Sequence, residues 1–339
     1  MPLPIIAVTM GDPAGIGPEL CLRILNHPGI REHCVPVIYG DADVLRHCAK
    51  LLGLPTPAKS VTHDDFIAST TPDAPLVVQI GTFPMHDLHH GTVSASTGNA
   101  AFNYFDIAIT DALSKKVDAI TTAPLSKEAL HAAGHRFPGH TEILASRCDS
   151  PSACMLQYSE EVRASFVTVH IGLAEVPSTL SSARILDVIR LTANAMSRIR
   201  GHAPLLGVLG LNPHAGENGL FGHREEEEII LPAIRTAQAE GINVEGPIPP
   251  DTAFLPERRR ATDAFVCMYH DQGHIPLKAL AFDSAVNTTL GLPIIRTSVD
   301  HGTACDIAWT GKANPGSLVQ AVLMAARLAR ESPSTSPKA

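Results

Sequence analysis

Short apolar runs alternate along the chain with longer segments in which apolar side chains recur every three to four residues. The short runs are typical of buried strands and the longer period is typical of amphipathic helices. Their regular alternation predicts an α/β fold with a mostly parallel sheet covered by helices. The predicted strands are 5–10, 35–40, 76–80, 119–122, 153–157, 164–170, 205–211, 265–269 and 294–299, and the predicted helices are 17–27, 41–52, 97–116, 183–199, 225–240 and 316–331.

The remaining segments say little about domain boundaries. Segment 54–74 is rich in Pro, Ser and Thr and is predicted to be a loop within a domain. The acidic run Glu225–Glu228 is predicted to be a solvated helix start, where the helix dipole favours negative charge. Segment 331–339 holds Ser and Pro without periodicity and is predicted to be a disordered tail. A chain of 339 residues is long enough for one large α/β unit or two domains.

Charge and composition exclude several classes of protein. The formal net charge of −8 has the wrong sign for an electrostatic nucleic-acid or membrane binder. No apolar run approaches the roughly 20 residues that span a bilayer, and segment 1–4 lacks the basic start of a signal peptide, so a cytoplasmic protein is expected. Seven scattered cysteines, none in C-x-x-C spacing, indicate reduced thiols and neither a disulfide framework nor a cysteine zinc site.

Histidine, which can bind metals and transfer protons, is unusually frequent, with 17 residues in the chain. Three of these histidines directly follow predicted apolar strands. These are His170, His214 and His270. Because the carboxyl ends of parallel strands line the ligand crevice of an open α/β sheet, the three imidazoles are expected to converge. Three imidazoles with an open fourth position form a catalytic divalent-metal site. A histidine at a strand end is more often a hydrogen-bonded loop residue, and both interpretations remain open at this point.

Other polar residues lie in turn contexts near these strands. Asp271 is either a carboxylate that orients a metal-bound imidazole or an ordinary turn residue. A lysine, an amide and an arginine could together hold a phosphate or carboxylate, although Lys and Arg taken singly are mostly surface charges. The residues in this group are His140, Thr141, Asp251, Lys278, Asn287 and Arg296.

Two segments are rich in glycine. GDPAGIGPE (11–19) follows a strand and opens a helix, so its N–H groups could face an anion, or it is a tight turn that needs glycine for positive φ. It fails the dinucleotide fingerprint, because Leu20 stands where Gly or Ala is required, and the chain has no P-loop. The long polar loop 301–315 follows a predicted strand, and loops of this length are usually functional.

These two loops resemble the cofactor-side loops of the isocitrate and isopropylmalate dehydrogenase fold. Together with TTAPLSKEAL (121–130), PGHTE (138–142), LNPHAGE (211–217), PPDTAF (249–254), YHDQGH (269–274) and VNTTLGLPIIRTSVDHGTA (286–304), they resemble the 4-hydroxythreonine-4-phosphate dehydrogenase family of vitamin B6 biosynthesis. The resemblance extends from residue 5 to about residue 330. It implies two α/β lobes with a cleft, not a standard Rossmann fold: a cofactor-side lobe over 1–130 and 290–330, and a metal-binding and dimerisation lobe over 131–289.

The resemblance also assigns residues. It implies that His170, His214 and His270 bind a divalent metal, with Zn²⁺ favoured and Mg²⁺, Mn²⁺ or Co²⁺ as alternatives. Substrate-binding positions are His140, Thr141, Lys278, Asn287 and Arg296, and Lys278 and Asp251 are the candidate catalytic residues. The cofactor side comprises Gly11, Asp12, Gly15, His301, Gly302, Thr303, Asp306 and Asn314.

The implied activity is an oxidative decarboxylation that depends on a metal and a nicotinamide cofactor. Hydride leaves a hydroxy acid for the cofactor, and CO₂ is lost from the resulting ketone. A carboxylate such as Asp306 near the adenosine ribose would repel a 2′-phosphate, which favours NAD over the alternative NADP. Family members are homodimers, and the His270 position reaches across from the partner.

The sequence departs from the family in two places. Trp309 stands where related adenosine loops usually carry glycine, and HIPLK (274–278) is closer to paralogue branches. Those branches include dehydrogenases of 4-phosphothreonate or 4-phosphoerythronate and decarboxylating cis-dihydrodiol dehydrogenases of terephthalate-type acids. Two other classes are a zinc hydrolase or deaminase, with Glu142 or Glu217 as base, and a non-catalytic binding protein. A hydrolase would need no nicotinamide cofactor, and two-lobed binding proteins are usually exported.

Overall fold

Strands and helices alternate in the computed structural model, which describes residues 2–68, 72–281 and 284–330. The predicted α/β class is therefore confirmed. The chain divides into two units, here called unit 1 (Met1–Pro151 with Leu292–Arg330) and unit 2 (Ser152–Gly291). The boundaries lie at Ser152 and Leu292, whereas the sequence-based division uses residues 131 and 290. The predicted tail 331–339 lies outside the described residues.

Unit 1 is built on parallel strands in the order β3-β4-β2-β1-β5-β12. The inner strands are buried on both faces, and this is why they read in the sequence as continuous apolar runs. The strands are β1 (Ile5–Thr9), β2 (Val35–Gly40), β3 (Ser60–Thr62), β4 (Leu76–Gln79), β5 (Ala119–Thr122) and β12 (Arg296–Val299).

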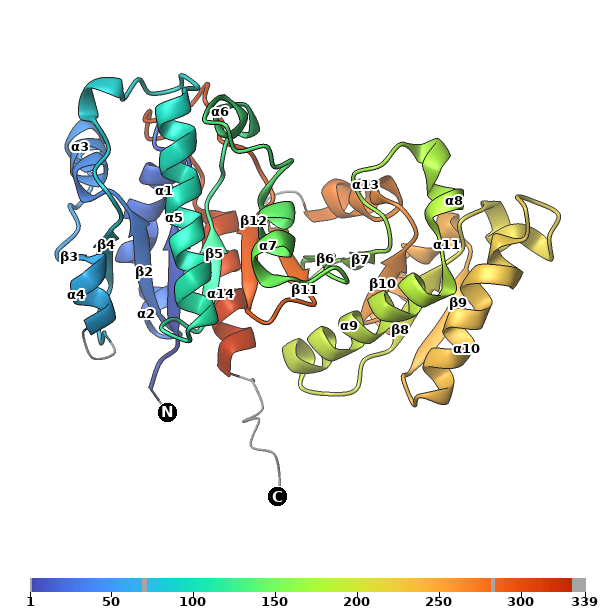
Figure 1. Cartoon of the computed structure of the whole chain (residues 1–339). Helices are drawn as coiled ribbons and strands as arrows, with labels where there is room; N and C mark the ends of the chain where they lie inside the picture. The colour runs from blue at the N-terminus through green and yellow to red at the C-terminus, as the bar shows by residue number, and fades with distance from the viewer. Residues whose placement is uncertain (1, 69–71, 282–283, 331–339) are drawn as a thin grey trace. The chain divides into compact units, whose positions relative to one another are not determined.

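Helices cover both faces of this sheet. In Figure 1, α5 (Ala95–Leu113) crosses in front of the strands, and α14 (Gly316–Arg330) lies behind them; both pack on β1 and β5. Asp41 caps α3 by accepting from the N–H groups of Asp43 and Val44, and Ser94 caps α5 through Thr97. The other helices of unit 1 are α1 (Gly17–Leu25), α2 (Pro28–Arg31), α3 (Ala42–Leu52), α4 (His63–Ala68), α6 (Lys127–Ala132) and α7 (His140–Cys148).

Unit 2 has a mixed sheet in the order β11-β6-β7-β10-β8-β9. Strand β6 (Cys154–Tyr158) is antiparallel to β11 (Val286–Leu290) and to β7 (Arg163–Phe166). The other neighbours, β7, β10 (Ala264–Cys267), β8 (Leu206–Leu209) and β9 (Val244–Ile248), are parallel. The helices are α8 (Val176–Thr179), α9 (Ser182–Arg200), α10 (Leu231–Ala239), α11 (Pro250–Ala253), α12 (Pro256–Ala261) and α13 (His270–Ala281).

Every predicted strand and long helix has a counterpart, and the differences lie in polar or short segments. Strands β3, β9 and β11 were not predicted, because their sequences carry polar residues, Gly or Pro among few apolar ones. Segment 54–74, predicted to be a loop, contains β3 and the short helix α4, because pairing with β4 and burial of Phe66 order it.

Two polar segments of unit 2 also differ from their predictions. The segment from His270, interpreted as a polar turn, is the start of helix α13. The predicted helix 225–240 begins with a π-helical turn over Glu226–Ile230 before α10. None of the helices within the described residues has the length and apolar character needed to cross a bilayer.

The contact between α5 and α6 provides a test of packing in unit 1. A Cβ on Gly98 would lie 2.1 Å from the carbonyl oxygen of Ala129, so only glycine fits. We expect Gly98→Ala to lower the free energy of unfolding by about 1–3 kcal/mol, because overpacking forces the backbone apart. Urea unfolding measures the change. Asn103→Ala, at an exposed position of the same helix, is the control and should not destabilise. Equal stability of Gly98→Ala and the wild type would contradict this packing.

Candidate active site

The register of two parallel strands brings two of the predicted histidines together. Backbone hydrogen bonds continue beyond β7 and β10, from the N–H of Val167 to Cys267 O at 2.9 Å, and the Thr168 hydroxyl donates to Met268 O at 2.7 Å. The chain then reaches His170 on one side and His270 on the other. Their ring centroids lie 6.1 Å apart, with the planes inclined by 40°. The predicted convergence is therefore observed for this pair.

His214 lies in a strained turn of its own, over Pro213–Glu217. His214 and Ala215 both have positive φ, at 53° and 51°, which costs a non-glycine residue energy and is common at functional sites. The Glu226 side chain stabilises this turn by accepting hydrogen bonds from the backbone just before it. Its buried Oε1 accepts from the N–H groups of Leu211 and Asn212, each at 2.8 Å. The interpretation of the acidic run as a solvated helix start is wrong for Glu226, because this carboxylate serves the His214 turn.

The donor set suits a divalent cation. His270 Nδ1 lies 2.6 Å from Asp271 Oδ1, and His214 Nδ1 lies 3.3 Å from Glu217 Oε2. Each carboxylate orients an imidazole so that Nε2 is the nitrogen left for a metal, as metal-bound histidines require. Within one copy of the described chain, no group of three or more His, Cys, Asp or Glu residues is arranged to hold a metal ion. Of the three predicted ligands, the structure brings His170 and His270 together, and His214 lies on its own turn.

The other predicted polar residues of unit 2 lie on three different elements. Helix α11, which carries the exposed Asp251, packs against the turn that holds His214. Asn287 lies on β11, and its buried Oδ1 has no hydrogen-bond partner within the described structure, so it can accept a hydrogen bond. Lys278 is exposed in the last turn of α13.

Unit 1 carries a buried cationic group. Arg296, on β12, is 2% exposed and donates to the Thr122 hydroxyl at 2.7 Å. Burial lowers the pKa of Arg296 to about 9, partly opposed by the Glu142 carboxylate. His140 begins α7, with its ring edge against Phe105. Burial, followed by the charges of Arg296 and Lys127, holds the pKa of His140 well below its usual range.

This group has the chemistry of an anion site. The N–H groups at the start of α7, where His140 and Thr141 lie, carry partial positive charge, and Arg296 adds a guanidinium. Sequence reasoning missed Lys127, whose Cε lies 3.7 Å from the position of a Cβ on Gly139. The residue stands inside the TTAPLSKEAL motif, but nothing in the sequence shows that the loop folds back onto Gly139.

The two glycine-rich loops of unit 1 lie against each other. Ile16 N–H donates to Thr303 O at 3.0 Å, and Trp309 Nε1 donates to Pro13 O at 3.1 Å. The buried Glu19 carboxylate accepts from the N–H groups of Gly311 and Ala313, both at 3.2 Å. Trp309 has φ of 60°, a conformation that glycine adopts readily and other residues rarely adopt.

Within the first loop, Gly11 has the positive φ that the tight-turn interpretation predicts. Gly11 has φ of 70°, and a Cβ there would lie 2.2 Å from Pro124 O. Asp12 is buried and accepts from Ala14 N–H at 2.9 Å; burial raises its pKa, against the lowering effect of that hydrogen bond and of Thr97. Gly15 approaches the second loop closely, because a Cβ there would lie 3.0 Å from Thr303 Cβ.

The second loop leaves several polar groups at its surface. Asp306 and Gly302 are exposed, and His301 is half-buried, with Nδ1 3.0 Å from Gly302 O. The Asn314 side chain accepts from Gly316 N–H at 2.9 Å and so caps the start of α14.

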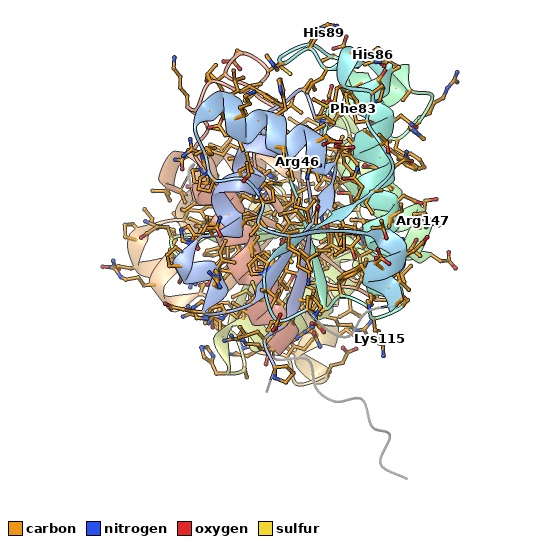
Figure 2. The ribbon with its side chains drawn as sticks, turned by 90° about the vertical axis from the view of Figure 1, so that its left-hand side faces the viewer. Arg46, Phe83, His86, His89, Lys115 and Arg147 are labelled. Carbon is orange, nitrogen blue, oxygen red and sulfur yellow. The ribbon has the colours of Figure 1, made fainter. Side chains whose placement is uncertain are left out.

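A third segment, after β4, joins these loops and was missed by sequence reasoning. Gly91 N–H donates to Ala14 O at 2.8 Å, and His90 stacks on Trp309 with 4.8 Å between ring centroids. Burial and the neighbouring His47 and His89 lower the pKa of His90. Phe83 turns into the unit, whereas His86 and His89 lie at its surface (Figure 2). The histidines of this segment show neither a helical nor a strand period, so the sequence could not predict the contact between His90 and Trp309.

Comparison with known proteins identifies the family. The family model described as "Pyridoxal phosphate biosynthetic protein PdxA" matches residues 32–325. A D-threonate 4-phosphate dehydrogenase from Cupriavidus necator is 45% identical over 96% of this chain and 98% of its own length. A 4-hydroxythreonine-4-phosphate dehydrogenase from Trichlorobacter lovleyi is 42% identical over 97% of this chain and 98% of its own.

Solved structures agree with this family. The 4-hydroxythreonine-4-phosphate dehydrogenase from Klebsiella pneumoniae superposes with a TM-score of 0.83 at 43% identity, covering 96% of this chain and 99% of that one. A terephthalate 1,2-cis-dihydrodiol dehydrogenase from Burkholderia xenovorans superposes with a TM-score of 0.69 at 30% identity, covering 96% and 98%. The relatives are named as dehydrogenases, an activity that implies a nicotinamide cofactor. The chain is therefore an oxidoreductase and belongs to the PdxA family.

The low pKa of His140 predicts how stability depends on pH. Because the folded protein holds His140 neutral, the unfolded chain binds more protons once pH falls below about 6.5. Its contribution to stability is complete above that pH and is lost as pH falls toward the folded-state pKa. We expect His140→Gln to reduce the loss of unfolding free energy on acidification, measured by urea titration across the acid range. His86→Gln, whose parent side chain is 84% exposed, should keep the wild-type dependence. Identical pH profiles for His140→Gln and the wild type would contradict the assignment.

Proposed function

We propose that the protein catalyses the NAD- and divalent-metal-dependent oxidation of a phosphorylated hydroxy acid, followed by decarboxylation. The substrate is 4-hydroxythreonine 4-phosphate or the related 4-phosphothreonate or 4-phosphoerythronate. The observation that carries the proposal is the buried Arg296 beside His140 at the start of α7, on a chain whose relatives at 42% and 45% identity are named for phosphorylated substrates.

The anion group binds the phosphoryl oxygens in this proposal. A dianion at the start of α7 would accept from Arg296, His140 and the Thr141 backbone or hydroxyl, and Lys127 adds a second positive charge. Because Arg296 is fully buried, its charge is poorly screened by water and gains most from an anionic partner. His140 is neutral in the free protein, so it donates one hydrogen bond, and an incoming phosphate favours its protonation.

The histidines of unit 2 are the proposed metal ligands. His170 and His270 with His214 would hold the cation through Nε2, with Asp271 and Glu217 fixing two of the rings. When bound, Zn²⁺ or a similar cation supplies a Lewis acid that lowers the pKa of a substrate hydroxyl and stabilises developing oxygen charge. Asn287 Oδ1, buried without a partner in the described structure, accepts a substrate hydrogen bond, and Asp251 accepts the hydroxyl proton as general base. Lys278 Nζ holds the carboxylate or returns a proton after CO₂ leaves.

The loops of unit 1 are the proposed cofactor site. The turn containing Gly11, Asp12 and Gly15 is braced against the loop that contains His301, Gly302, Thr303, Asp306 and Asn314. Exposed Asp306 would accept from the ribose hydroxyls and repel a 2′-phosphate, which favours NAD over NADP. A braced loop binds a cofactor with little further loss of conformational entropy. We further propose that the two units form the isocitrate and isopropylmalate dehydrogenase type of fold.

The direct test follows reduction of the nicotinamide by its absorbance. Protein with Zn²⁺ or Co²⁺ and NAD should form the reduced cofactor with a phosphorylated hydroxy acid, more slowly with NADP, and not after treatment with a chelator until metal returns. A signal only with a terephthalate-type dihydrodiol would support the activity named for the Burkholderia xenovorans structure. Unchanged activity and metal content in His170→Ala, His214→Ala and His270→Ala would refute the metal site.

We also propose a homodimer in which the partner completes the histidine group. Large apolar side chains are exposed on unit 2 beside each histidine: Ile171 follows His170, Phe221 lies 5.9 Å from the His214 ring, and Ile275 is on α13. Ile275 is 66% exposed. Exposed apolar side chains beside the proposed ligands support an interface between copies, because such an interface would remove them from water.

Sedimentation measures the oligomeric state. We expect Ile275→Asp to convert the dimer to monomer, because the interface would bury an unpaired charge, and to lose bound metal with it. Leu113→Asp changes an exposed apolar side chain of unit 1 and should remain dimeric. A monomeric wild type, or a dimeric Ile275→Asp with full metal content, would contradict the shared site.

A further inference from the structure

The proposed metal ligand His270 is the outermost of three stacked rings, followed by His274 and Phe166. The His270 and His274 rings are nearly parallel, at 10°, with centroids 3.8 Å apart, and the His274 and Phe166 rings are 4.4 Å apart at 25°. The two histidines stand at i and i+4 of α13, the spacing that puts one side chain directly above the other. His274 is only 5% exposed, whereas His270 lies at the open end of the column.

Two hydrogen bonds fix the orientation of the His274 ring. Nδ1 lies 3.0 Å from the backbone carbonyl of His270, which can only accept, so Nδ1 carries the proton. Nε2 lies 3.3 Å from Nε2 of the Gln157 side chain, an amide that donates, so Nε2 accepts. The ring is therefore held at both nitrogens. Without these partners, burying the two polar nitrogens of the ring would cost free energy. A phenylalanine ring would fill the same space and would need no hydrogen-bond partners.

Helix α13 packs closely against the strands next to this column of rings. A Cβ on Gly273 would lie 2.7 Å from Phe166 Cε1 and 2.9 Å from Cys267 Sγ, so α13 is in close contact with β7 and β10 at this point. Gln157 lies on β6, which pairs with β7 on the edge opposite to β10. The His274 plane is thus determined by three strands and one helix, and it presents a flat face to His270.

We propose that His274 is a positioning residue for His270. Its face sets the plane of the His270 imidazole, and the Asp271 carboxylate at Nδ1 sets the rotation within that plane, so that Nε2 has one direction for a divalent cation. The inference rests on the proposed function, because it assumes that His270 is a metal ligand. It assigns His274 no contact with metal, substrate or cofactor.

The test measures Co²⁺ binding to the full-length protein, by the dissociation constant and by the visible absorption of the bound ion. His274→Ala and His274→Leu remove the ring and should weaken binding about 10-fold or more, with an altered absorption spectrum, as is typical when support for a metal ligand is lost. His274→Phe keeps a flat ring and should restore both toward wild type. The leucine variant fills the space, so the test does not depend on the folding of the alanine variant.

His135→Ala is the matched control, because its ring also stacks on an aromatic ring, Phe102, at 3.8 Å and 13°, but in unit 1. It should leave Co²⁺ binding unchanged. Wild-type affinity and spectrum in both ring-free variants would overturn the inference, and so would a His274→Phe variant as weak as they are. His270→Ala distinguishes a failure of the proposed metal site from a failure of the proposed role of His274. If it binds Co²⁺ like the wild type, the proposed metal site itself is wrong; if it loses Co²⁺ while the ring-free variants do not, only the role of His274 fails.

Discussion

The parallel register between β7 and β10 is the constraint on which the histidine group depends. The strands pair from Ala164 with Phe265 onward, and their hydrogen bonding continues past the ends of both strands through Thr168 and Met268. A shift of one residue would turn each following side chain to the other side of its strand. The 6.1 Å between the rings of His170 and His270 is therefore a consequence of backbone pairing that is fixed deep in unit 2.

Unit 1 shows a second use of buried polar groups. Glu19, a carboxylate on α1 with no exposure, holds two N–H groups of the 301–315 loop, and Trp309 closes the same loop onto Pro13. Arg296 is buried on β12, where its guanidinium donates to the neutral hydroxyl of Thr122. Burying polar groups is costly unless each finds partners, so these hydrogen bonds offset part of the cost of burying Glu19 and Arg296.

The elements that sequence patterns missed share a physical cause. Strand β11 carries Asn and Thr among its apolar residues, and helix α13 opens with His-Asp-Gln-Gly, which reads as a turn. In both cases the tertiary environment stabilises the backbone: β11 pairs with β6, and α13 lies against Phe166. Local propensity is a weak predictor where packing supplies most of the free energy. The contribution of Lys127 to the anion group and of Glu226 to the His214 turn could not be predicted for the same reason.

The order of secondary structure, the α/β class and the polar motifs at strand ends follow from the sequence alone, because buried strands and amphipathic helices impose strict periods on it. Only the tertiary structure decided which motifs meet. It joined residues 100 positions apart at the ends of β7 and β10, folded the segment at His90 onto Trp309, and stacked His274 against His270. These contacts depend on strand order, register and helix packing, and such long-range arrangements leave no periodic trace in a single sequence.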